Sequence, residues 1–420
     1  MQYRTIDKIV DSLIVFMLIM SAGGMLFVLN RNIASVVFLL FILFVLIFME
    51  NKWKKTIINS ILLTFSILVV LGSINYFVVE TEQTANKYLF HLLTVTLSVL
   101  ALFHFKNNRT NQQLIRNLYV VLGLILFHAL FSFIAFLFVR NSLIAISTAY
   151  NEHETFLHIF FYITDSKMIN LFGLEFCRNQ GLFWEPGVLQ GFLNMFFFLE
   201  AFIIKKRKSL LLLTAAVILT TYSTTGLALL LIQSVVYIFY EFKTNKWLIP
   251  FVFVLCIPLY MIFSMNAEEK IQGEKEASFQ KRYFDLIQPL FIAFENPLTG
   301  IGLDAEQFQN MRQEFYISSS SLSSLQEQTG IESKVRGTDK GSSNSITFLF
   351  AATGFPTAIL LVYMFFKQQI IKEKKWLWML IMVVSVMSEP LLLRPFFFLF
   401  IVSGFTYVFY KMTSYKQQIA

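Results

Sequence analysis

The chain has 420 residues, of which 56% are hydrophobic and 14% are charged, and its formal net charge is +8. Soluble domains carry about 25% charged residues, so this composition excludes an ordinary soluble globular protein. The basic excess lies in short loops between apolar runs, which indicates a topological signal and gives no reason to expect a nucleic-acid partner.

The apolar runs predict twelve membrane helices. Most runs are long enough to cross about 30 Å of hydrocarbon. They are continuous rather than alternating, so helices are expected and not a barrel. The seventh and eighth helices are short and form a tight hairpin at "TYSTTG". The fold class is an all-α polytopic membrane protein with helices at residues 9–29, 32–49, 57–79, 88–105, 117–139, 187–204, 209–222, 224–240, 247–265, 346–366, 376–392 and 395–410.

Lysine and arginine set the expected orientation of these helices. Alternate loops, all of them short, hold 20 of the 34 basic residues, including the run "KKRK" at 205–208. Basic loops stay in the cytoplasm, so both termini are predicted to be cytoplasmic. The first apolar stretch continues to Leu29 without a convincing cleavage site, which predicts an uncleaved first helix.

The chain is expected to divide into five segments. Residues 1–140 hold helices one to five, and residues 141–186 form a first long external loop with an interfacial or re-entrant helix. Residues 187–265 hold helices six to nine, and residues 266–345 form a large external loop between helices nine and ten. Residues 346–420 hold the last three helices and a cytoplasmic tail. The first half of the large loop has helical periodicity, whereas roughly 318–340 is serine-rich and expected to be disordered.

Charged residues on the external side are candidate functional residues, because charge near a bilayer is costly. Convergent arginines would bind a diphosphate, since guanidinium pairs bidentately with phosphate oxygens and stays charged. Glu185 precedes the sixth helix, where the positive end of the helix dipole stabilises a carboxylate. Alternatively, these residues only begin or anchor helices at the interface. The external candidates are Arg178, Glu185, Lys281, Arg282, Arg312, Arg336, Lys340, Glu389 and Arg394.

Four stretches resemble motifs of the bacterial O-antigen polymerase and O-antigen ligase superfamily. Residues 178–193, "RNQGLFWEPGVLQGFL", resemble that family's Arg to Glu-Pro start of a membrane helix. Residues 281–308, "KRYFDLIQPLFIAFENPLTGIGLDAEQF", resemble a loop segment with an early Arg and an NP-x-x-G-x-G turn. Residues 343–354, "SNSITFLFAATG", resemble the element where the large loop re-enters the membrane, and "TYSTTG" at 221–226 resembles the family's Thr/Ser-Gly hairpin.

The resemblance implies a GT-C-like glycosyltransferase at the periplasmic face of the bacterial inner membrane. Its substrate would be an oligosaccharide on undecaprenyl diphosphate, which a polymerase adds to an O-antigen or capsular chain and a ligase transfers to lipid A core. Ligases of the family carry a histidine in the re-entry element, whereas this chain has Ser343 and then Asn344, which favours a polymerase. The expected partners are the lipid-linked oligosaccharide, membrane lipids, a flippase and a chain-length regulator, without cofactor, metal or nucleic acid.

The resemblance also implies a metal-independent transfer that inverts the anomeric centre. Arg178 and Arg282 would neutralise the leaving undecaprenyl diphosphate as preorganised donors. Glu185 would activate the acceptor hydroxyl as a general base or hold Arg178 by a salt bridge. The residues expected to contact substrate are Gly181, Pro186, Lys281, Gly302, Arg312, Arg336, Ser343 and Asn344.

Two further classes stay open beside polymerase and ligase. A lipid-linked oligosaccharide flippase fits the twelve helices and the basic balance, but the chain has no apparent internal repeat and concentrates its external charge in one loop. A peptidoglycan glycosyltransferase of the shape-and-division family shares the architecture. Its usual loop aspartate would then have to be Asp285 or Asp304.

Overall fold

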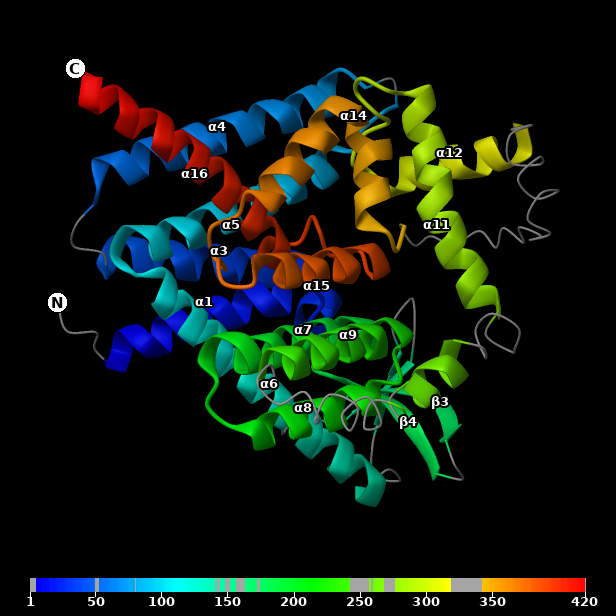
Figure 1. The fold of residues 1–420 in the computed structure, drawn as a ribbon. Helices are drawn as coiled ribbons and strands as arrows, with labels where there is room; N and C mark the ends of the chain where they lie inside the picture. The colour runs from blue at the N-terminus through cyan, green and yellow to red at the C-terminus, as the bar shows by residue number, and fades with distance from the viewer. Residues whose placement is uncertain are drawn as a thin grey trace. The chain divides into compact units, whose positions relative to one another are not determined.

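The computed structural model describes residues 5–49, 53–79, 81–139, 142, 144–147, 152–155, 163–171, 174–241, 257, 260–267, 276–318 and 342–419. Most of these residues are helical (Figure 1), and eight of the described helices are long and apolar enough to cross a membrane. The prediction of a helical multi-pass membrane protein is therefore confirmed. Contacts divide the chain into two compact units.

The first unit comprises Met1–Ala34, Gln112–Ile271 and Ile371–Ser385. It contains helices and a small sheet that the prediction of an all-helical fold did not include. Its elements are α1 (Thr5–Ser21), α2 (Met25–Leu29), α6 (Asn111–Val139), β1 (Ile144–Ser147), β2 (Glu152–Thr155), β3 (Ile163–Leu171), β4 (Leu174–Gly181), α7 (Pro186–Phe198) with its π-helical continuation η2 (Leu199–Ile204), α8 (Lys208–Thr221), α9 (Thr224–Glu241) and α15 (Lys375–Ser388).

The second unit comprises Ser35–Asn111, Gln272–Ile370 and Val386–Ala420. Within it, α16 packs against α4, α5 and α14, and α11 packs against α14. Its elements are α3 (Arg31–Phe48), α4 (Lys55–Phe77), α5 (Ala85–Asn108), α11 (Glu276–Glu295), α12 (Ala305–Ser318), α14 (Ser345–Phe366) and α16 (Pro395–Ile419).

Most predicted helices are found within a few residues of their expected bounds. The ninth, at 247–265, lies largely outside the described residues, which here include only 257 and 260–267. A count of twelve therefore stays a prediction. The serine-rich stretch expected to be disordered also lies outside the described residues from 319 to 341.

The predicted helix at 9–29 is broken into α1 and α2 at two glycines. Gly23 has φ +123°, a conformation that only glycine adopts without strain. The freed backbone groups bond to the chain that precedes α7: the N–H of Trp184 donates to the Gly23 carbonyl at 3.1 Å, and that of Met25 to the Leu182 carbonyl at 2.8 Å. A break inside a membrane protein needs such substitute partners, which sequence periodicity does not reveal.

The loop at 141–186, which was predicted to be external, contains strands where an interfacial or re-entrant helix was expected. The strands form an antiparallel sheet in the order β1-β2-β3-β4. In β3 and β4, Ile169 pairs with Phe176 and Met168 with Cys177. In this sheet the backbone N–H and C=O groups of neighbouring extended segments pair with one another, which satisfies them wherever water is excluded. Residues 156–162 of this loop lie outside the described residues.

Helix α14 is also broken, at Gly354. The turn that follows α11 supplies hydrogen-bond partners for the backbone groups at this break. Pro356 has no N–H, so the carbonyl of Ala352 loses its helical donor. That carbonyl instead accepts hydrogen bonds from the Gly302 N–H at 2.9 Å and from Asn75 Nδ2 at 2.6 Å. The N–H of Phe355 in turn donates to the Pro297 carbonyl at 2.8 Å. The NP-x-x-G-x-G stretch at 296–302 therefore has a structural role, because its backbone pairs with the backbone groups of α14 at the break.

Candidate functional site

A buried carboxylate on α11 organises the start of α14 in the second unit. Asp285 is fully buried. Its Oδ2 accepts hydrogen bonds from the Ser343 N–H at 2.9 Å and from Ser343 Oγ at 2.7 Å. Its Oδ1 lies 3.1 Å from Nη1 of Arg312 on α12. Three segments that are distant in sequence thus meet at one side chain.

Arg312 is held in this cluster and is not a solvated loop charge. Its side chain is 14% exposed, and its Nε donates to Gln288 Oε1 at 2.8 Å. Asp285 and Gln288 are three residues apart and therefore share a face of α11. Burial lowers the pKa of the Arg312 guanidinium, while Asp285 acts in the opposite direction. Arg312 was expected to contact substrate, but two of its nitrogens already have protein partners.

Asn344 caps the N-terminus of α14. Its Oδ1 accepts hydrogen bonds from the N–H groups of Ile346 at 3.1 Å and Thr347 at 3.2 Å, as an N-cap residue does. The carbonyl of Asp285 accepts from Ser342 Oγ at 3.2 Å and from Thr347 Oγ1 at 2.8 Å. Main-chain and side-chain groups of one α11 residue therefore fix where α14 begins.

The turn between α15 and α16 adjoins the same helix start. Ser345 Oγ donates to the Glu389 carbonyl and accepts from the Leu391 N–H, both at 2.8 Å. Arg394 follows in this turn, half-buried, immediately before the first residue of α16. Burial lowers the pKa of Arg394 to about 10. The N-terminus of α16 is the positive end of its helix dipole, which disfavours a cation and favours an anion. An anion bound here would therefore be stabilised both by α16 and by the guanidinium of Arg394.

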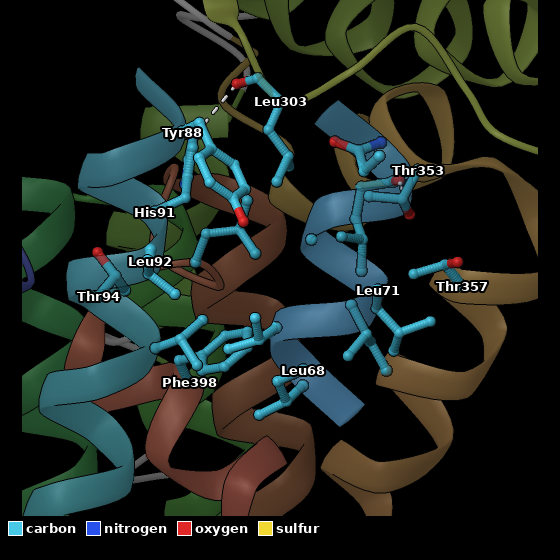
Figure 2. A pocket seen from close by; sticks show the side chains of 17 residues that line it. Leu68, Leu71, Tyr88, His91, Leu92, Thr94, Leu303, Thr353, Thr357 and Phe398 are labelled. Carbon is cyan, nitrogen blue, oxygen red and sulfur yellow. Dashed lines mark hydrogen bonds between the residues drawn. The ribbon is translucent and has the colours of Figure 1, made fainter. Parts of the chain in front are cut away.

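An apolar pocket lies in the same unit between α4, α5, α14 and α16 (Figure 2). Leu68, Leu71 and Leu92 line its wall. His91 lies beside Leu303, and its Nε2 is 3.3 Å from the Leu303 carbonyl. The pocket combines an aliphatic interior with a few polar groups, the usual composition of a small-molecule site.

The first motif, in the other unit, forms structural contacts around Arg178 and Glu185. Arg178 Nε donates to the Thr221 carbonyl at 3.0 Å, at the end of α8 where a cation is favoured. Glu185 is the N-cap residue of α7, although its side chain makes no capping hydrogen bond. Pro186 is buried at the start of that helix, as its fixed φ favours. Gly181 ends β4 with φ +54°, which explains the glycine.

The remaining predicted residues belong to the large loop at 266–345. Arg282 is half-buried on α11, and Lys281 belongs to the same helix, but its side chain is outside the described part of the structure. Gly302 is buried with φ +90° in the turn that bonds to α14 at its break. Arg336 lies outside the described residues.

The structure thus brings three predicted residues, Arg312, Ser343 and Asn344, together around Asp285. Sequence reasoning considered Asp285 only by analogy, and it did not identify Gln288 or Ser345. The available signal was a pair of polar residues, Asp285 and Gln288, three positions apart within the otherwise apolar stretch 284–294.

The cluster brings a carboxylate, hydroxyl groups and a largely buried guanidinium together beside the start of one candidate membrane helix, and these groups already pair with one another. Among the described residues, no group of three or more His, Cys, Asp or Glu side chains is placed to hold a metal ion. Comparison with family models, with curated proteins and with solved structures finds no match for this chain.

Proposed function

We propose that the chain polymerises undecaprenyl-diphosphate-linked oligosaccharide repeat units into O-antigen or capsular polysaccharide at the periplasmic face of the bacterial inner membrane. The observation that supports the proposal is the meeting of two family-like stretches, 281–308 and 343–354, at one polar cluster beside the start of α14. The proposal keeps twelve membrane helices, cytoplasmic termini and a large periplasmic loop between the ninth and tenth helices.

The proposed reaction is a single displacement without metal. The acceptor hydroxyl oxygen attacks the anomeric carbon, the bond from that carbon to the diphosphate oxygen breaks, and undecaprenyl diphosphate leaves with the electron pair. Arg178 and Arg282 neutralise the leaving group, and Glu185 takes the acceptor proton. Arg178 Nε already bonds to Thr221, so its Nη groups would have to bind the phosphate.

Arg394, in the second unit, is a further candidate donor for a diphosphate. It is half-buried, lies at a helix N-terminus, and belongs to the turn that Ser345 ties to α14. Arg312, by comparison, is already paired with Asp285 and Gln288. The apolar pocket of Figure 2 supplies an environment suited to part of an isoprenoid chain in the same unit.

A strain that lacks the chain tests the reaction class on a gel of its surface polysaccharide. A polymerase predicts loss of the ladder, with a single repeat unit still attached to the surface acceptor. Loss of all surface antigen would indicate a flippase or a ligase instead, and an unchanged ladder would contradict the whole proposal.

Single substitutions test the residues. Arg178→Ala and Arg394→Ala are each expected to abolish long chains while the protein remains in the membrane at the wild-type level. Arg116→Ala, which removes an exposed arginine at a predicted cytoplasmic position, is the matched control and should leave the ladder intact. A wild-type chain-length distribution in Arg394→Ala would remove Arg394 from the site.

A further inference from the structure

We propose that the first unit carries a binding site for the phosphate head group of an anionic phospholipid. The site is formed around Tyr240, near the end of α9, by the basic run at 205–208 and by Lys374, which immediately precedes α15. This inference does not depend on the proposed enzymatic function. It concerns the predicted cytoplasmic loops, which that function does not use.

Two lysines from distant parts of the chain converge on one aromatic ring. Lys205 Nζ lies 4.6 Å from the centroid of the Tyr240 ring and 3.4 Å from its hydroxyl oxygen. Lys374 Nζ lies 4.3 Å from the same centroid. A ring face attracts each ammonium group, but the two like charges still repel each other. A phosphate group bound beside these ammonium groups would offset their like charge.

Two neighbouring carboxylates are already engaged, whereas Glu373, next to Lys374, is exposed. Glu241 forms an ion pair with Lys208, with an O to N distance of 3.2 Å. Glu200 is buried, and its Oε1 accepts the backbone N–H of Arg207. The exposed side chains of residues 205–208 therefore leave an excess of positive charge at this surface. Charge complementarity favours an anionic partner.

The backbone presents both lysines from defined turns. Lys205 has φ +53° and Lys374 has φ +45°, conformations that residues other than glycine rarely adopt. The N–H of Lys205 donates to the Glu200 carbonyl at 2.9 Å, and the Lys374 carbonyl accepts the N–H of Leu377 at 2.9 Å. Fixed turns reduce the ordering that binding would otherwise require.

The position of the site favours a lipid over a free anion. Lys205 follows the last residue of a candidate membrane span, and Lys374 precedes an apolar helix, so the proposal places both at head-group depth. Tyr240 is 45% exposed and Trp376 on α15 is 58% exposed. Exposed tyrosine and tryptophan beside lysine are typical of the membrane interface, and juxtamembrane basic clusters attract anionic lipids.

Titration of the purified full chain in phosphatidylcholine nanodiscs with phosphatidylglycerol tests the proposal, with lipid occupancy and the thermal unfolding temperature as readouts. The double variant Lys205→Gln/Lys374→Gln should bind phosphatidylglycerol roughly thirtyfold more weakly than wild type. Lys205→Arg/Lys374→Arg keeps both charges and should retain most of the affinity. Inorganic phosphate alone should not raise the unfolding temperature.

The control variant is Lys54→Gln/Lys55→Gln, which removes the same charge from two exposed lysines at the start of α4. It should bind phosphatidylglycerol as wild type does. Equal losses in both double variants would show a general effect of net charge and would overturn a defined site. Wild-type affinity in Lys205→Gln/Lys374→Gln would overturn it as well, and stabilisation by inorganic phosphate would show a site for the free anion instead.

Discussion

Removal of one partner from the buried Asp285–Arg312 pair is expected to destabilise the second unit strongly. Asp285 has no exposed surface and Arg312 is 14% exposed, so either charge, left alone, stays largely out of water. Breaking a buried ion pair costs about 3 to 5 kcal/mol because one charge remains uncompensated. Arg312→Met leaves the carboxylate with two hydrogen bonds from Ser343, whereas Asp285→Asn leaves the guanidinium with Gln288.

The double variant Asp285→Asn/Arg312→Met removes both charges at once. It should therefore lose less stability than the two single losses together, with a coupling of roughly 1 to 3 kcal/mol. Denaturant titration of the detergent-solubilised protein, read as the free energy of unfolding, measures all four corners of the cycle. Arg116→Met, at an exposed position, is the control and should change that free energy by less than about 0.5 kcal/mol.

Additive losses in the double variant would refute the reasoning, because independent effects would mean that the two charges do not stabilise each other. A loss of less than about 1 kcal/mol in the free energy of unfolding in both single variants would also refute the reasoning, because the charge left without its partner would then be solvated.

Two further predictions concern the backbone around α14. Gly300→Ala should destabilise the protein by roughly 2 to 4 kcal/mol, because a Cβ there lies 2.5 Å from the Ala351 carbonyl oxygen and Gly300 has φ +68°. Gly72→Ala is its control in the same unit: the nearest atom to that Cβ is 3.9 Å away, and the same titration should show no loss. Asn344→Ala should cost about 1 kcal/mol through loss of the helix cap, whereas Asn344→Ser should retain the cap, and equal unfolding curves for these two variants would contradict this role of Asn344.

The sequence alone determined that this is a helical membrane protein and where most helices begin and end. Transfer of an apolar segment into hydrocarbon depends on the segment itself, so its length and composition suffice. The start of α7 could also be predicted from the local sequence, because proline at the first helical position has its φ already fixed and has no N–H to satisfy.

The tertiary structure decided where helices break and which polar residues meet. The backbone groups freed at the break after α1 bond to Leu182 and Trp184, and those freed in α14 bond to residues 297–302. Both breaks therefore depend on backbone groups that are distant in the sequence. Asp285, Arg312 and Ser343 meet for a similar reason. A buried charge is tolerated only where folding supplies its partners, and hydropathy and spacing contain no information about which distant residues those are.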